Sequence, residues 1–266
     1  MYVKKKYYLC TENSIMMKNI VYIAVSIISI MMSACHRPMH VVKASSEIVM
    51  IDSTLDAIHD VNYIASMAPI KADLEAQLGA PIGYAPMELE VHQPECTMLN
   101  WASDALLAIA RQKCPEAVDV AIVNIGGMRC NWAAGDITFR NVFELMPFDN
   151  MLVVLTLKGN DLQQLSEIFA YSGGQGIAGM RIKAVGDKVM QQEALVTING
   201  KPLEMDKTYT VATSDYLSQG NDGMLPLKNH IQCWNSEEKI RDLYIEYIKQ
   251  VKVVEARVDG RMDVGL

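Results

Sequence analysis

The stretch NIGGMRCNWAAGDITFRNVFELMPF, residues 124–148, decides how this chain is interpreted. It contains a glycine pair, Gly126 and Gly127, followed by Arg129, and it closes on Phe148. The apolar run directly before it is rich in β-branched residues, which is typical of a buried strand. Glycines let a ligand approach the backbone, and a guanidinium group fits a carboxylate or a phosphate. The segment is therefore either a tight turn with Arg129 in a salt bridge, or a backbone shaped around a ligand.

Two further segments raise the same choice. In PFDN the proline sets a turn, so Phe148 is presented from a rigid loop, where it could stack a base or cap the core. In SDYLSQGNDGM, residues 214–224, Tyr216 lies at the end of a predicted strand and Asp222 lies in a Gly/Asn/Asp loop. Asp222 could accept hydrogen bonds from ribose hydroxyls or form a structural Asx-turn. If the fold brings Phe148 and Tyr216 together, they form a clamp for a base.

Composition limits the functions open to the chain. Its 266 residues, half of them hydrophobic, suffice for one sizeable core or for one domain with a tail. The net charge of -7 argues against nucleic-acid binding through a basic face. None of the six cysteines forms a C-x-x-C pair, so zinc spacing is absent. Four of them lie beyond the leader and could form two disulfides in an exported protein, or remain free and buried.

The N-terminal part has the layout of an export signal. Residues 1–35 hold a short positive start, an uninterrupted apolar run at 20–32, and small residues before Cys35. The Met-Ser-Ala-Cys ending resembles a bacterial lipobox, in which the cysteine is lipidated. A lipid on Cys35 would anchor the protein to a membrane, with its body facing the periplasm or the cell surface. A plain N-terminal membrane anchor is the alternative. We expect residues 36–46 to be a tether and residues 47–266 to be a single domain.

The remaining sequence predicts mixed secondary structure. Helices are expected at 48–78 (interrupted by Pro69), 96–113, 160–172 and 236–251, strands at 85–92, 118–125, 151–159, 180–185 and 209–217, a glycine-rich loop at 172–179, and a hairpin at 194–203 that turns at Asn199 and Gly200. Helices and strands alternate without a regular βαβ repeat. The predicted class is mixed α/β (α+β), with layered helices and mixed sheets.

The order of motifs resembles the C-terminal domain of the bacterial and animal 5'-nucleotidase/UDP-sugar hydrolase family. The resemblance covers roughly residues 48–264. The matching motifs are N-x-G-G-x-R at 124–129, G-D-I-T at 135–138, P-F-x-N at 147–150, L-x-G at 157–159, Y-x-V-A-T at 209–213, G-x-D-G at 220–223 and G-R-M at 260–262. Several motifs in the family's order make this resemblance specific.

The resemblance implies a nucleotide-binding site. The base would lie between Phe148 and Tyr216, and Asp222 would bind the ribose, with a polar cradle on the ribose and phosphate side. The residues that match the family's substrate-binding positions are Asn124, Gly126, Gly127, Arg129, Phe148, Tyr216 and Asp222. Three positions depart from the family pattern: Pro94 stands where a further arginine is found, Tyr216 where phenylalanine is usual, and Asn221 where the family has glycine, a change that still suits a turn.

In that family a separate N-terminal metallophosphoesterase domain performs hydrolysis, with two metals held by Asp, His and Asn side chains. None of the five histidines here lies in a comparable motif. We therefore expect no catalytic residue, metal site or cofactor in this chain. A separately encoded metallophosphoesterase subunit would supply divalent metals for nucleotide dephosphorylation in nucleotide catabolism. The alternative is a non-catalytic nucleoside- or nucleotide-binding lipoprotein, or a diverged scaffold.

Overall fold

The structure is a computed structural model that describes residues 16–29, 45–46, 48, 50–51, 60–185 and 193–264. The chain divides into two units, Met1–His59 and Asp60–Leu266. In the first unit, residues 16–29 are helical. No helix within the described residues is both long and apolar enough to cross a membrane. Cys35, the predicted lipidation site, lies outside the described residues, as does most of the predicted tether.

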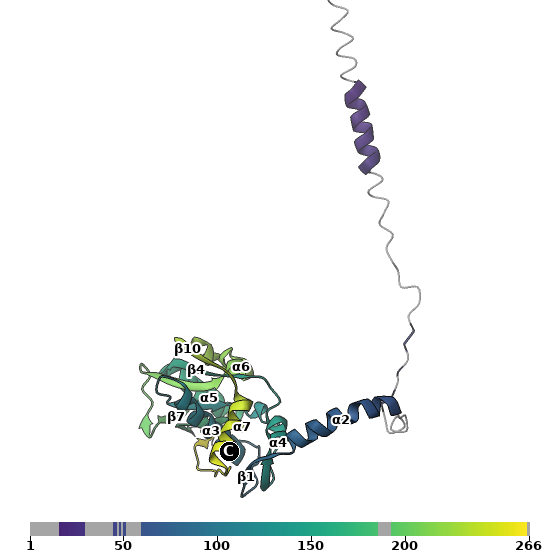
Figure 1. Cartoon of the computed structure of the whole chain (residues 1–266). Helices are drawn as coiled ribbons and strands as arrows, with labels where there is room; N and C mark the ends of the chain where they lie inside the picture. The colour runs from purple at the N-terminus through teal and green to yellow at the C-terminus, as the bar shows by residue number, and fades with distance from the viewer. Residues whose placement is uncertain are drawn as a thin grey trace, which may run out of the picture. The chain divides into compact units, whose positions relative to one another are not determined.

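The second unit is a mixed α/β domain, which confirms the predicted class (Figure 1). Its helices are α2 (Val61–Leu78), α3 (Thr97–Lys113), α4 (Phe139–Leu145), α5 (Gly159–Ser172), α6 (Asp215–Ser218) and α7 (Ile240–Val251). Its strands are β1 (Pro81–Ala85), β2 (Val120–Val123), β3 (Gly135–Thr138), β4 (Met151–Lys158), β5 (Gly176–Ala178), β6 (Met180–Val185), β7 (Glu193–Ile198), β8 (Lys201–Pro202), β9 (Thr208–Ser214), β10 (Gln232–Lys239) and β11 (Met262–Asp263). Short 3₁₀ turns are η2 (Ile125–Gly127), η3 (Asn221–Gly223) and η4 (Leu225–Asn229).

A five-stranded central sheet organises the domain. Its strand order is β10-β4-β9-β2-β5. Within this sheet β2 and β9 are parallel, whereas β4 runs antiparallel to β9 and to β10, and β5 runs antiparallel to β2. A second sheet has the order β11-β6-β7-β8, and β1 pairs with β3 in a two-stranded ribbon. The parallel pair places two distant segments of the chain at one edge of the sheet.

Both faces of the central sheet are buried. Successive side chains of a strand point to opposite faces, so Val120 and Ile122 enter one core while Ala121 and Val123 enter the other. Helices α3 and α7 cover the second of these faces, and α5 with strands of the smaller sheet covers the first. Burial of each large aliphatic side chain contributes about 1.5–3 kcal/mol. The central sheet is therefore held between two packed layers.

Some predicted elements are wrong in position. The segment 85–92 is not a strand: its first residue, Ala85, is the last residue of β1, and beyond it only Leu89 forms an isolated bridge, to Trp132. The reason is that its backbone bonds to side chains, since the Glu90 and Val91 amides donate to Thr97 and Asn131. The predicted last helix begins later, at Ile240, because the residues before it extend β10 along β4.

The structure also tests the predicted helix interruption, the glycine-rich loop, the hairpin and the state of the cysteines. Helix α2 continues through Pro69 without interruption, and three residues of the predicted glycine-rich loop form β5. The hairpin is confirmed: β7 pairs with β8, and both turn residues have positive φ, 49° at Asn199 and 77° at Gly200. The cysteines of this unit, Cys96, Cys114, Cys130 and Cys233, are all free.

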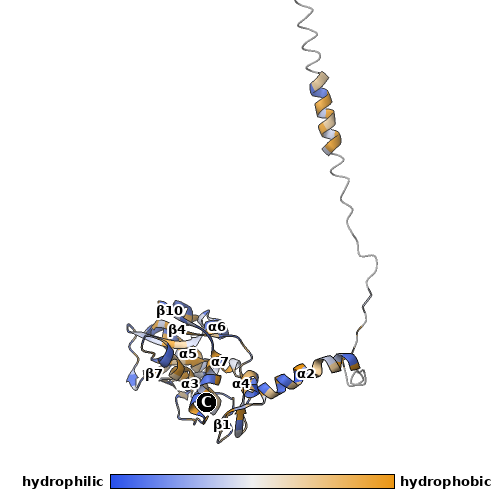
Figure 2. Cartoon of the chain, in the orientation of Figure 1, coloured by the Kyte–Doolittle hydropathy of each residue, from blue (hydrophilic) through white to orange (hydrophobic). Residues whose placement is uncertain are grey.

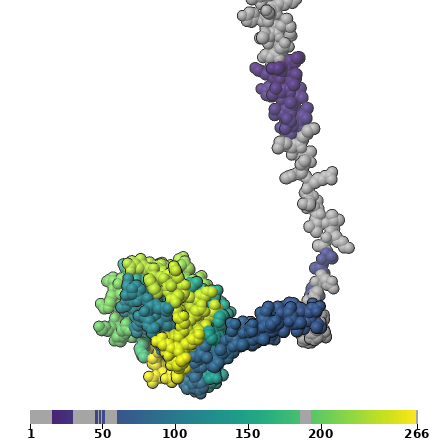
Figure 3. All heavy atoms as spheres, in the orientation of Figure 1, coloured from purple at the N-terminus to yellow at the C-terminus, as the bar shows by residue number. Residues whose placement is uncertain are grey.

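Helix α2 projects from the rest of its unit and has no buried residue (Figure 3). Its C-terminal end lies against α4, where Glu75 pairs with Arg140. Apolar and polar residues alternate along it (Figure 2), and Val61, Ile64 and Leu74 are each more than half exposed. Such a helix is marginally stable by itself in water, because helices in proteins depend mostly on packing.

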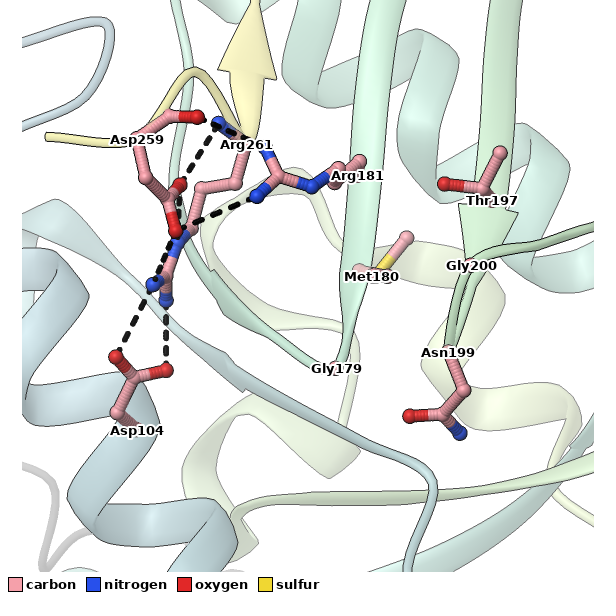
Figure 4. A pocket seen from close by; sticks show the side chains of 9 residues that line it. All are labelled: Asp104, Gly179, Met180, Arg181, Thr197, Asn199, Gly200, Asp259 and Arg261. Carbon is pink, nitrogen blue, oxygen red and sulfur yellow. Dashed lines mark hydrogen bonds and ion pairs between the residues drawn. The ribbon is translucent and has the colours of Figure 1, made fainter.

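Ion pairs fasten the C-terminal segment to α3. The Arg261 guanidinium donates to Asp104 at 2.7 Å and to Asp259 at 3.0 Å (Figure 4). The same Asp259 pairs with Arg181 across 3.4 Å. These groups line a polar recess of about 220 Å³ beside the 199–200 turn. Carboxylates already pair with both arginines. We therefore interpret these groups as structural ion pairs that hold the segment before β11 against α3.

Candidate functional site

Three distant segments meet at one edge of the central sheet. Strands β2 and β9 are parallel, so their carboxyl ends lie side by side and lead into η2 and α6. Strand β4 runs antiparallel to β9, with Leu152 opposite Ser214. Its amino end, preceded by the loop 147–150, therefore reaches the same edge. Ligand sites of α/β sheets commonly lie at such strand ends.

A cavity of about 310 Å³ opens at this edge. Its size falls at the lower end of the range for small-molecule sites, about 300–1,000 Å³. The lining residues are Asn124, Gly126, Gly127, Arg129, Phe148, Asn150, Tyr216 and Asp222. All seven residues predicted from the sequence thus lie around one cavity.

Asp222 is the polar centre of the cavity. It has a positive φ of 54° in the turn at residues 220–223, a conformation that aspartate tolerates in tight turns. The Asn124 amide donates to one of its carboxylate oxygens, and the Tyr216 hydroxyl donates to the other at 2.9 Å. The hydrogen bond to Asp222 raises the pKa of Tyr216, and the charge of that carboxylate and burial add to the increase.

Arg129 lies between the backbone turn and the aromatic ring. Its Nη1 donates to the Gly126 carbonyl at 3.1 Å, and its guanidinium lies 5.6 Å from the centre of the Phe148 ring. The salt bridge considered from the sequence is not seen, because no carboxylate of the described residues lies within ion-pair distance of Arg129. A guanidinium without a carboxylate partner remains available to an anionic ligand group.

The glycine pair has two different roles. A Cβ on Gly127 would lie 2.8 Å from the Asn124 side-chain oxygen, so a larger residue there would displace that amide. A Cβ on Gly126 would meet only ordinary contacts at 3.6 Å. The turn itself is held from outside the cavity, since the Ile125 amide donates to the Gln175 side chain at 2.8 Å.

The Phe148 loop is held by two basic side chains. Arg241 of α7 donates to the Phe148 carbonyl at 3.3 Å and to the Asp149 carboxylate at 2.7 Å. Lys239 also donates to Asp149, at 2.9 Å. The hydrogen bonds from Lys239 and Arg241 hold the pKa of Asp149 below its usual range. The loop therefore has a fixed backbone, and its aromatic ring is presented from a rigid support.

Sequence reasoning missed three residues that shape the site. Asn150 lines the cavity, and its place in the P-F-x-N motif was the signal that could have identified it. Gln175 and Arg241 contact the backbone of the site from other elements. No local pattern marks them, because their contribution depends on tertiary contacts.

No metal centre emerges among the described parts of the chain, where no group of three or more His, Cys, Asp or Glu side chains could hold an ion. The described residues of the cavity supply hydrogen-bonding groups, one guanidinium and two aromatic rings. Such a set suits binding of a polar ligand that has a flat ring.

The fold and the cavity define a mixed α/β domain with a ligand-sized site at the edge of its central sheet. Residues 79–229 match the family described as "5'-nucleotidase, C-terminal domain". The chain belongs to this family.

Similar proteins from other organisms support this family membership. Protein UshA of Yersinia enterocolitica is 30% identical over 186 residues, which cover 68% of this chain and 33% of that protein. The 5'-nucleotidase of Mus musculus is 30% identical over 190 residues, which cover 63% of this chain and 33% of the mouse protein. Thus the chain spans about a third of the length of these relatives.

Two solved structures have a similar fold. The 5'-nucleotidase precursor from Thermus thermophilus has a TM-score of 0.65 and 25% identity, over 76% of this chain and 43% of that one. The NAD nucleotidase of Haemophilus influenzae has a TM-score of 0.54 and 21% identity, over 77% and 43% of the two chains. The latter likeness supports the fold alone.

Proposed function

We propose that the cavity binds a nucleoside or nucleotide. The observation that carries this proposal is the gathering of Phe148, Tyr216 and Asp222 around a single cavity. Aromatic faces stack on bases whatever the base identity, and each stack contributes about 1–3 kcal/mol. Asp222 offers acceptors to the ribose hydroxyls, and Arg129 offers a cation to the phosphate side.

Titration of the purified chain with AMP and adenosine tests this proposal. The double variant Phe148→Ala with Tyr216→Ala removes both rings, and we expect it to abolish binding. Tyr171→Ala is a matched control, because Tyr171 is highly exposed and does not line the cavity. Absence of binding by the unaltered chain to any nucleotide or nucleoside would refute the proposal.

We further propose that the domain works with a separately encoded metallophosphoesterase subunit in nucleotide dephosphorylation, as part of nucleotide catabolism. The family membership supports this, as do the exposed apolar side chains of α2, which a partner subunit would cover. The partner would contribute the divalent metals and the attacking water. Release of phosphate from AMP by the purified chain with Mn²⁺, without any partner, would contradict this division of labour.

We also propose that the protein is exported and lipidated on Cys35. The apolar run and the small residues before this cysteine support the proposal. Labelling of cells with a fatty-acid probe should mark the protein, and Cys35→Ser should remove the label and release the protein from the membrane fraction. Equal labelling of both forms would show that Cys35 is not the acceptor.

A further inference from the structure

The ring and the carboxylate of the cavity are joined by a direct hydrogen bond. The Tyr216 hydroxyl donates its one proton to Oδ1 of Asp222 at 2.9 Å, while the Asn124 amide donates to Oδ2. The Asn221 side chain donates to the Tyr216 carbonyl at 2.7 Å. Tyr216 and Asp222 therefore form one fixed unit rather than two independent side chains.

This arrangement leaves a defined set of acceptors free. A carboxylate has about four acceptor positions, two on each oxygen. One position on each oxygen is occupied by Tyr216 or Asn124, so one remains on each oxygen. Two adjacent acceptors match a vicinal diol, which donates two O–H groups from neighbouring carbons.

Both side chains are exposed, and the hydrogen bond between them restrains each. Tyr216 is 42% exposed, and Asp222 lies in an exposed turn with positive φ. Ordering such side chains at the moment of binding lowers affinity. A hydrogen bond already formed in the free protein removes part of that cost.

We infer that the Tyr216 hydroxyl is a positioning group that holds Asp222 ready for the 2',3'-diol of a ribose, and so gives the cavity a preference for ribonucleosides over sugars without the diol. This inference rests on the proposed nucleoside binding. A ligand without the diol leaves the free acceptors of Asp222 unpaired against the sugar, which disfavours its binding. The aromatic ring stacks on the base in either case.

The test compares adenosine with 2',3'-dideoxyadenosine on the purified chain and on Tyr216→Phe, which keeps the ring and loses only the hydroxyl. We expect Tyr216→Phe to weaken adenosine binding about three- to tenfold, the effect of one hydrogen bond. Binding of the dideoxy ligand should change less than about twofold. Tyr171→Phe, at an exposed tyrosine outside the cavity, is the matched control and should bind both ligands as the unaltered chain does.

A second arm separates positioning from general structural damage. In an Asp222→Asn background the tyrosine hydroxyl has no carboxylate to hold, so adding Tyr216→Phe should cause no further loss of adenosine affinity. If Tyr216→Phe weakens both ligands equally, weakens neither, or adds its full effect to Asp222→Asn, the inference is wrong. If the unaltered chain binds neither ligand, the proposed function fails and the inference fails with it.

Discussion

Replacement of Arg241 by methionine tests whether the Phe148 loop is held from α7. The Arg241 side chain is 10% exposed, and its guanidinium donates to the Phe148 carbonyl at 3.3 Å and lies 4.3 Å from the centre of the Phe143 ring. Loss of a hydrogen bond from a charged group costs about 1.5–3 kcal/mol, and loss of the cation–π contact about 0.5–1 kcal/mol. The pair with the exposed Asp149 adds little to stability, because water screens it.

Methionine fills much of the space of the arginine stem, so part of this loss is recovered by packing. The Nε of Arg241 has no hydrogen-bond partner among the described residues, and its ion-pair contact at 3.8 Å is with the exposed carboxylate of Asp242, so its removal costs little. We expect the free energy of unfolding to fall by about 2–3 kcal/mol, which lowers the Tm by about 4–12 °C for a domain of this size. Nucleoside affinity should fall as well, because the ring loses its fixed support.

Lys239→Met provides the matched control for Arg241→Met. Lys239 contacts the same Asp149 but not the Phe148 carbonyl, and such exposed pairs contribute little to stability. Thermal unfolding followed by circular dichroism, with adenosine titration on the same samples, measures both effects. Should Arg241→Met melt and bind like Lys239→Met, the carbonyl contact does not hold the loop.

Three further predictions concern the C-terminal ion pairs and the candidate site. Hydrogen bonds from Arg261 hold the pKa of Asp259 below the ordinary value of 3.8. The stabilising contribution of Asp259 is therefore present above that pH and is lost as pH falls through the lowered pKa. Denaturant unfolding between pH 2 and pH 6 should show a smaller loss of stability in acid for Asp259→Asn than for the unaltered chain. Gly127→Ala places a methyl 2.8 Å from the Asn124 side-chain oxygen, and we expect weaker nucleoside binding by titration, whereas unchanged binding would mean that the amide moves without consequence. Phe148→Ala alone should weaken adenosine binding by about 1–3 kcal/mol, or about 5- to 150-fold, and a smaller loss would show that its ring does not stack on the base.

Elements with a strong local pattern were predictable from the sequence. The amphipathic run at 96–113 becomes α3, and the β-branched runs around β2 and β4 become buried strands. The three residues of β5 carry no such pattern. They form a strand by pairing with β2, and they pack against α3. Short elements that owe their form to a neighbour cannot be predicted from their own residues.

In the candidate site, too, some features were predictable from the sequence and others depend on long-range contacts. The seven predicted residues were found because their types and order resemble a family. Their meeting in space follows from the parallel pairing of β2 and β9, a long-range contact that no local pattern specifies. The supports Gln175 and Arg241 were invisible for this reason, since each acts on the backbone of a segment far away in the chain.

Each of the three segments at the cavity has its own support. Gln175 holds the turn after β2, Arg241 holds the loop before β4, and Tyr216 with Asn124 holds the carboxylate after β9. Substitutions at Gln175 and Arg241 should therefore change how well the segments are ordered without altering the groups that face the ligand. Tyr216 is different, because its ring lines the cavity while its hydroxyl is a support. Separating these two contributions requires the Tyr→Phe change, and a Tyr→Ala change would remove both at once.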